Sequence, residues 1–327
     1  MPLISVVIPC FNSAAYLGAT IAAAIAQRPA DASFDVEVIV VDDGSTDDPR
    51  SVATSFADGV RYVAQPNGGV SRARNVGVTH AAGDYLCFLD ADDVLAPGWF
   101  ARAMREFAAT PDTGAVFGQF HRWHGTATDD PAEEWARLRQ ASPGRFEGGN
   151  IPVRTGWIYH QMLLDSWILC SSAIVRKAFA QRAGLFEEGV PVGEDWDFWL
   201  RVSRECPVVA LDVLAVLYRQ HAASASRKLR QQNHAVRLIQ AAIQRYGWQG
   251  PTGIAADRRA VHAALAKHSL WHAIDHFDRG SYRIGLRASL AAVRHQPGSL
   301  THWRYLLSGL TGLGRIHTKL VIARGRR

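Results

Sequence analysis

Apolar residues alternate between strand-like runs and helical spacing over the first hundred residues of the chain. The strand-like runs are residues 4–8, 36–41, 60–63 and 85–89. The segments with helical spacing are residues 14–27, 49–56 and 71–80. Short, almost wholly apolar runs are typical of strands buried on both faces. Their alternation with helices predicts an α/β, Rossmann-like fold with a mostly parallel sheet and helices on both faces.

The pattern loosens between residues 110 and 165, where Gly, Pro and Trp are frequent. We interpret this stretch as a variable excursion with a short helix at 131–140. Strand and helix patterns then return. The predicted strands are residues 167–175 and 208–218, and the predicted helices are residues 176–183 and 194–205.

The last hundred residues have only helical patterns, so we expect a smaller helical C-terminal region. Its predicted helices are residues 231–246, 255–278, 282–295 and 300–310. We place the domain boundary after residue 226. The first domain is divided at residue 110 into two halves, and residues 227–327 form the helical region.

Composition and charge describe a globular chain with two electrostatic parts. The 327 residues are 48% hydrophobic and 20% charged, with a formal net charge of +6. Residues 1–221 have 18 Lys+Arg against 27 Asp+Glu, whereas residues 222–327 have 18 against 3, or net charges of −9 and +15. The basic part suggests contact with an anionic surface such as membrane lipid. A solvated basic helical face is the alternative.

Membrane-spanning and disulfide-bonded classes are disfavoured. Asp165 and Asp212 interrupt the two most apolar stretches, and no run approaches the roughly 18 residues of a transmembrane helix. The N-terminus lacks the basic start of a signal peptide. The four cysteines are far apart, which favours reduced buried thiols. We expect a cytoplasmic protein, with peripheral attachment at the inner face of the membrane through its basic region.

Acidic residues follow two of the predicted strands. Asp42 and Asp43 come after the second strand, and Asp90 and Asp92 come after the fourth. Ligands of parallel sheets bind outside the carboxyl ends of the strands, so both clusters fall at the binding edge. Asp90 and Asp92, at i and i+2, project to one side of an extended backbone and suit Mg²⁺ or Mn²⁺. The alternative is an acidic turn that is merely solvated or that caps the next helix.

A glycine-rich loop at residues 65–75 lies between these clusters and opens a helix. Ser71 is a candidate N-cap, and Arg72 and Arg74 are near the helix start. Helix N-termini and arginines suit a diphosphate, although the loop taken alone favours an ordinary capped helix with exposed arginines.

A second acidic pair, Glu194 and Asp195, begins a helix rich in aromatic residues. Acids in a first helical turn ordinarily stabilise the helix dipole. If the loop 189–193 brings this turn to the metal edge, a carboxylate there can also deprotonate an acceptor hydroxyl.

Together these motifs resemble the family 2 inverting glycosyltransferases of GT-A fold. The motifs occur in order at residues 5–12, 40–47, 67–75, 83–93 and 193–196. The resemblance covers about residues 3–226. Any one motif is weak, but five in sequence are specific. It implies that residues 1–110 bind the nucleotide and that 111–226 form the acceptor side.

The resemblance also implies roles for individual residues. Those expected around the nucleotide and its diphosphate are Pro9, Phe11, Asn12, Asp42, Asp43, Asn67, Arg72, Arg74 and Asp90. Asp92, with Asp90, is the expected ligand of Mn²⁺ or Mg²⁺. His221 stands where some members have a metal or phosphate ligand, although a lone His after a strand is more often structural. Asp195 resembles the catalytic base, and Glu194 either supports it or binds the acceptor.

The activity implied is metal-dependent, inverting transfer of one sugar from a nucleotide-diphosphate sugar to a glycan, lipid-linked or protein acceptor, as in polysaccharide biosynthesis. A hexosyltransferase is expected, and the Gln-x-x-Arg-Trp motif of processive members is missing. A non-catalytic nucleotide-sugar-binding or membrane-associated scaffold is one alternative. A sugar nucleotidylyltransferase is another, disfavoured because its glycine-rich basic signature is missing after the first strand. Nucleic-acid binding is not expected.

Overall fold

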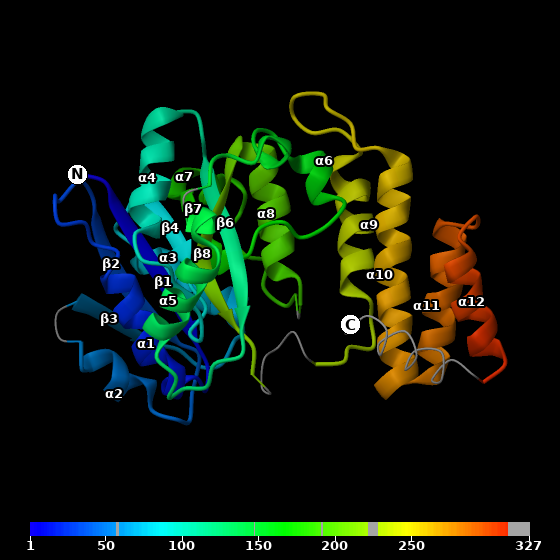
Figure 1. The fold of residues 1–327 in the computed structure, drawn as a ribbon, viewed down its shortest axis with the longest axis horizontal. Helices are drawn as coiled ribbons and strands as arrows, with labels where there is room; N and C mark the ends of the chain where they lie inside the picture. Colours follow the sequence, from blue (N-terminus) through cyan, green and yellow to red (C-terminus); the bar gives the residue numbers. More distant parts are fainter. Residues whose placement is uncertain (57–58, 147, 191, 222–227, 313–327) are drawn as a thin grey trace. The chain divides into compact units, whose positions relative to one another are not determined.

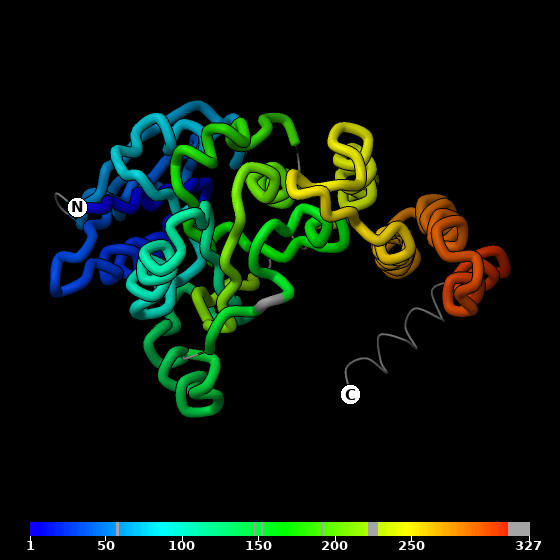
Figure 2. Tube along the Cα trace, turned by 90° about the horizontal axis from the view of Figure 1, so that it is seen from above, coloured from blue at the N-terminus to red at the C-terminus, as the bar shows by residue number. Residues whose placement is uncertain are grey.

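The computed structural model describes residues 1–312 except 57–58, 147, 191 and 222–227. The chain divides into two compact units (Figures 1 and 2). The first unit comprises Met1–Met162 and Ser166–Ala222, and the second comprises Leu163–Asp165 and Ala223–Arg327. The short segment Leu163–Asp165, which we expected within the acceptor-side half, thus belongs to the second unit.

A single mixed sheet of eight strands organises the described part of the first unit, in the order β3-β2-β1-β4-β7-β6-β8-β5. The strands are β1 (Leu3–Cys10), β2 (Asp35–Asp42), β3 (Val60–Ala64), β4 (Tyr85–Phe88), β5 (Val94–Leu95), β6 (Ala115–Trp123), β7 (Ala173–Arg176) and β8 (Val208–Arg219). Strands β3, β2, β1 and β4 are parallel, as are β6 and β8. The other three pairings are antiparallel. The predicted α/β fold with a mostly parallel sheet is confirmed.

The strand register aligns the carboxyl ends of the first strands. Cys10 pairs with Asp42, and Val7 pairs with Phe88 two residues before Asp90. The segments that follow β1, β2 and β4 therefore leave the sheet at one edge, as expected from their parallel pairing.

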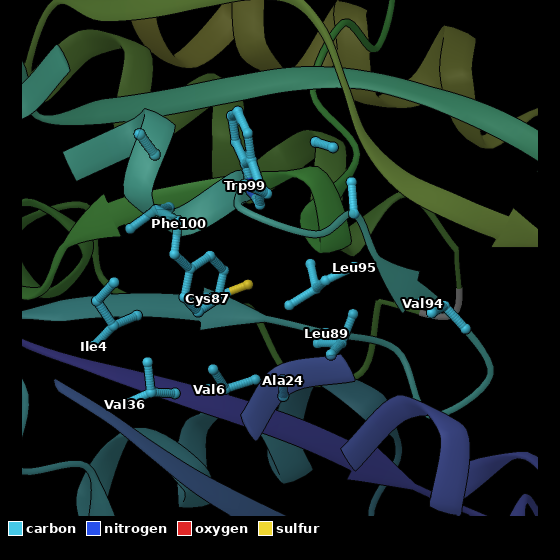
Figure 3. Packing of buried hydrophobic residues seen from close by; sticks show 14 of the residues in the cluster. Ile4, Val6, Ala24, Val36, Cys87, Leu89, Val94, Leu95, Trp99 and Phe100 are labelled. Atoms are coloured by element: carbon cyan, nitrogen blue, oxygen red, sulfur yellow. The ribbon is translucent and has the colours of Figure 1, made fainter. Parts of the chain in front are cut away.

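Alternate residues of β1 face different helices, α1 (Ala14–Ile25) and α3 (Val70–His80). Ile4, Val6 and Ile8 lie in the main core cluster together with residues of α1, and Figure 3 shows Val6 near Ala24. Val7 points to the other face, where a Cβ atom on Gly77 of α3 would lie 2.2 Å from its Cγ1. Helices thus cover both faces of the sheet.

The remaining α-helices of the first unit are α2 (Pro49–Thr54), α4 (Trp99–Ala109), α5 (Pro131–Ala141), α6 (Tyr159–Met162), α7 (Lys177–Arg182) and α8 (Glu194–Glu205). The helices of the second unit, coloured from yellow to red in Figure 2, are α9 (His234–Tyr246), α10 (Arg258–Arg279), α11 (Tyr282–His295) and α12 (Leu300–Leu310). Side chains of Asn233, Asp257 and Ser299 cap α9, α10 and α12. The helical C-terminal region is confirmed.

Two strands lie where the sequence did not predict them. The nine-residue strand β6 is hidden in the sequence because Gly118, Gln119, His121 and Arg122 interrupt its apolar run. Gly118 is required there, since a Cβ atom would lie 2.7 Å from the Val213 carbonyl oxygen of β8. The two-residue strand β5 was also missed.

Two local predictions were wrong. The strand predicted at 167–175 is reduced to β7, because Cys170–Ser172 form a 3₁₀ turn in which the Ser172 hydroxyl donates to the Leu169 carbonyl. Ser71 is not the N-cap of α3. The helix begins one residue earlier at Val70, and Gly69 is its N-cap with φ of 88°.

Candidate functional site

The carboxylate of Asp42 is held at the end of β2 by two hydrogen bonds. The Ser45 N–H and the Tyr62 hydroxyl donate to its two oxygens. Burial acts to raise the pKa of Asp42, but these hydrogen bonds outweigh it and keep the pKa below its usual value. Asp42 is therefore a fixed acceptor, charged at neutral pH, at the binding edge of the sheet.

The neighbouring Asp43 organises the glycine-rich loop. Its carboxylate accepts from the backbone N–H groups of Gly68 and Gly69, each at 2.8 Å, and from the side chains of Gln65 and Asn67. Asp43 is 3% exposed. Through these hydrogen bonds, Asp43 and Asn67 stabilise the conformation of the loop.

The loop after β1 is tied to the loop after β2. Asn12, in the left-handed region with φ of 50°, accepts from the Thr46 N–H, and its own N–H donates to the Ser45 hydroxyl. Pro9 is buried in β1, whereas the Phe11 side chain is 50% exposed beside this junction. An exposed ring on a fixed loop is available for stacking against a flat ligand.

Asp92 and His221 meet at the same edge, although 129 residues separate them. The His221 Nε2 lies 2.8 Å from Asp92 Oδ2, and the His221 ring stacks on Tyr16 with ring centroids 4.8 Å apart. Burial and the nearby Asp90 raise the pKa of Asp92, while His221 opposes the shift. The sequence-predicted pair is thus brought together.

These donors fit a divalent cation. The site brings together carboxylate oxygens and an imidazole nitrogen, which suit Mn²⁺. A bound cation would also relieve the mutual repulsion of the Asp90 and Asp92 carboxylates. In the part of the chain that the structure describes, no three His, Cys, Asp or Glu side chains already have the arrangement of a metal site. Asp90 instead pairs with Arg74.

A buried group of three residues, not anticipated from the sequence, holds the backbone next to the Asp92–His221 pair. Asp93 is fully buried and accepts from the Ser171 hydroxyl at 2.6 Å and from the Arg219 N–H at 3.0 Å. Arg219 in turn donates through Nε to the Asp92 carbonyl. The third Asp of the cluster thereby fixes the backbone that carries Asp92 and leads to His221.

Arg74 connects the acidic cluster after β4 to the acidic pair that begins α8. Its guanidinium lies 2.8 Å from Asp90 Oδ1 and 3.0 Å from Glu194 Oε1, and it is 3% exposed. It also lies over the Phe186 ring, 4.9 Å from the centroid. The diphosphate contact expected of Arg74 stays a prediction. In this structure its guanidinium is paired with two carboxylates. Arg72, in the first turn of α3, is exposed, and its side chain lies beside Gly68 of the loop.

Asp195 stands next to this bridge in the first turn of α8. The preceding Gly193 has φ of 84°, and this turn of the backbone starts the helix. Burial, and next the charge of Glu194, raise the pKa of Asp195 to about 6, while Arg74 opposes the shift. A carboxylate with this pKa is charged at pH 7 yet more basic than an ordinary Asp.

The first unit thus places the Asp92–His221 pair, the buried Arg74 bridge and the carboxylate of Asp195, with its raised pKa, along one edge of the sheet. The family model described as Glycosyl transferase family 2 matches residues 5–164. This part of the chain belongs to glycosyltransferase family 2, and the fold is that of GT-A glycosyltransferases.

A relative with a glycosyltransferase name is similar to most of the chain. An uncharacterized glycosyltransferase of Rickettsia felis is 26% identical over 240 residues, which is 73% of this chain and 37% of that protein. The chain therefore spans little more than a third of that relative.

Two solved structures share the fold. Residues 1–349 of S. aureus TarS in complex with UDP-GlcNAc superpose with a TM-score of 0.68 and 16% identity, covering 99% of this chain and 92% of that one. The mannosyltransferase PcManGT from Pyrobaculum calidifontis, in complex with GDP-Man and Mn²⁺, gives 0.59 and 19%, covering 98% and 86%.

Two findings concern the remaining expectations. Among the helices of residues 1–312, as far as these are described, none is both long and apolar enough to cross a membrane. The four cysteines are buried and unpaired, as predicted.

Proposed function

We propose that the first unit catalyses metal-dependent transfer of one sugar from a nucleoside-diphosphate sugar to an acceptor hydroxyl, with inversion at the anomeric carbon. The observation that carries this proposal is the Asp90–Arg74–Glu194 bridge, which links the carboxylates of the donor edge to the turn that holds Asp195. Residues 1–110 bind the donor, and residues 111–226, apart from Leu163–Asp165 of the second unit, bind the acceptor.

Donor binding uses the edge formed by β1, β2 and the glycine-rich loop. Asp42 accepts a hydrogen bond from the nucleotide base, the exposed Phe11 ring borders the nucleotide, and Arg72 meets the diphosphate. UDP-GlcNAc and GDP-Man in the two structurally similar proteins support a nucleoside-diphosphate sugar as the donor class.

Asp92, Asp90 and His221 would hold Mn²⁺ or Mg²⁺. When bound, such a cation neutralises charge on the departing diphosphate. The Mn²⁺ in PcManGT supports this part of the proposal. Asp93, Ser171 and Arg219 keep the Asp92 backbone in place for it.

Asp195 acts as the general base. The acceptor oxygen attacks the anomeric carbon as the bond from that carbon to the diphosphate oxygen breaks. Asp195 takes the hydroxyl proton, and the nucleoside diphosphate leaves with the bonding electrons. Glu194, held by Arg74, orients the turn. A single displacement of this kind inverts the anomeric centre.

The stereochemical outcome tests the proposal. UDP-GlcNAc and GDP-mannose are each incubated with the protein, Mn²⁺ and a panel of glycan, lipid-linked and peptide acceptors, and the product is examined by proton NMR. We expect one sugar per acceptor and an anomeric configuration opposite to that of the donor. A product with the donor's configuration contradicts the single displacement, and turnover that is unchanged after removal of all divalent cations contradicts the metal.

A further inference from the structure

Helix α12 has an apolar face that no described part of the chain covers. The exposed side chains are Leu300 (80%), Trp303 (42%), Leu307 (55%) and Leu310 (66%). Their spacing of three, four and three residues places them on one side of the helix. The buried residues of α12 are His302, Tyr305, Leu306 and Gly309. The helix therefore packs through one face and presents a separate apolar face, called here the α12 stripe (Leu300, Trp303, Leu307 and Leu310).

Isolated exposed apolar residues are normal on a soluble surface, but an aligned set marks an interaction site. The Trp303 indole N–H donates to the Pro297 carbonyl at 2.8 Å, so the polar end of this ring is satisfied while part of its apolar surface stays exposed. A ring with one apolar and one polar end suits a lipid–water interface.

A basic hollow adjoins the N-terminal end of the stripe. It is lined by Arg258, Arg259, His262, His295 and the segment Gln296–Ser299, which leads directly into α12. The Nδ1 atoms of His262 and His295 are 3.2 Å apart. None of these lining residues is acidic, and the N-terminus of α12 adds partial positive charge. The chemistry of this hollow suits a phosphate group.

The positive charge of the sequence around α12 favours an anionic partner. From residue 279 to residue 327 the chain has ten Lys+Arg and no Asp or Glu. A second copy of the same face would bring like charges together, which disfavours self-association. An anionic lipid surface offers negative charge to the arginines and hydrocarbon to the stripe.

We propose that the α12 stripe and the adjoining basic hollow together bind the surface of a membrane that contains anionic phospholipid. The helix lies in the plane of the interface, its leucines enter the acyl boundary, and Arg258 and Arg259 contact lipid phosphates. The role is attachment, and it is independent of the transfer reaction proposed for the first unit.

Flotation of the full chain with vesicles tests the attachment. Vesicles of phosphatidylcholine are compared with vesicles that also contain phosphatidylglycerol, at low and at high salt. We expect the mixed vesicles to bind about ten-fold more tightly at low salt and this preference to shrink at high salt.

Two sets of variants separate the stripe from the hollow. Leu300→Ser/Leu307→Ser/Leu310→Ser removes three exposed apolar groups and should lower binding about ten-fold or more, whereas Val153→Ser, 70% exposed on the first unit, should not. Arg258→Gln/Arg259→Gln should remove most of the preference for phosphatidylglycerol, and the exposed Arg122→Gln is its control. Thermal unfolding confirms that each variant is folded.

Three results would overturn the proposal. The first is no binding of the wild type to the mixed vesicles at low salt. The second is equal binding by the triple leucine variant, which places any lipid contact outside α12. The third is a wild-type dimer that the leucine changes dissociate, measured by sedimentation, because the stripe is then an interface between copies of the chain.

Discussion

Arg74 holds Asp90 and Glu194 together, although Glu194 follows Arg74 by 120 residues in the sequence. The two ion-pair distances are 2.8 and 3.0 Å, and the Glu194 side chain is 14% exposed. Because the guanidinium is planar and forked, it can serve both carboxylates at once in a fixed geometry. Arg74 therefore sets the position of the α8 turn relative to the carboxyl end of β4.

Replacing Arg74 tests this relationship. Arg74→Met leaves Glu194 and Asp90 without their partner, and we expect a loss of about 1–3 kcal/mol in the free energy of unfolding. Arg74→Lys keeps the charge but not the fork, so it should recover stability more than transfer rate. The measurements are urea unfolding and steady-state kinetics. Arg182→Met, which breaks an exposed pair with Glu205, should cost under about 1 kcal/mol. Equal stability of Arg74→Met and wild type would remove the positioning role.

Asp195→Asn tests the base. The amide has the same shape but does not accept the acceptor proton, so we expect a loss of about 10²–10⁴-fold in kcat. Binding of the nucleoside diphosphate, measured by calorimetry, should stay close to that of the wild type. A variant with full activity would exclude Asp195 as the base.

The pH profile follows from the raised pKa of Asp195. A base must be deprotonated to act, so kcat/KM should fall as the pH drops through about 6. Because the raised pKa means that the folded state binds this proton more tightly, protonation of Asp195 favours folding, and this group does not cause unfolding at low pH. Circular dichroism at each pH separates the two effects. An unchanged kcat/KM down to pH 5 would contradict the assignment.

Gly77→Ala tests the packing of α3 on β1. Alanine is the better helix former, by up to about 1 kcal/mol. Its Cβ atom would, however, lie 2.2 Å from Cγ1 of the buried Val7. We expect the clash to prevail and to destabilise the protein by about 1–3 kcal/mol in chemical unfolding. Gly144→Ala, where the new Cβ atom meets nothing within 4 Å, is the control and should be near neutral. A more stable Gly77→Ala protein would show that the sheet can move away.

Much of the fold follows from local sequence patterns. Strands β1, β2 and β4 are continuous apolar runs, and the helices between them have clear spacing, so the edge that carries Asp42 and Asp90 could be predicted. Strand β6 could not be predicted in this way, because its apolar pattern is broken at Gly118. Its place in the sheet depends on pairing with β7 and β8, which are distant in the sequence.

The candidate site was predictable only where a residue stands in a recognisable motif. Asp92 and Asp195 are of that kind. The Asp93 contacts with Ser171 and Arg219 span 78 and 126 residues, and no local pattern connects them. Arg74 illustrates the same limit, since its place in a helix after a glycine-rich loop predicts a diphosphate contact, but no local pattern indicates its ion pairs with Asp90 and Glu194.

Nucleotide binding with and without Mn²⁺ tests the central claim most directly. UDP and GDP are titrated calorimetrically into the wild type, Asp92→Ala and Asp112→Ala, the last of which removes an exposed carboxylate outside the site. We predict that one nucleotide binds the wild type and Asp112→Ala tightly only when Mn²⁺ is present. Asp92→Ala should lose this tight, Mn²⁺-dependent binding. Binding that is equally tight in Asp92→Ala, or the same without Mn²⁺, would contradict a metal-dependent donor site at this edge.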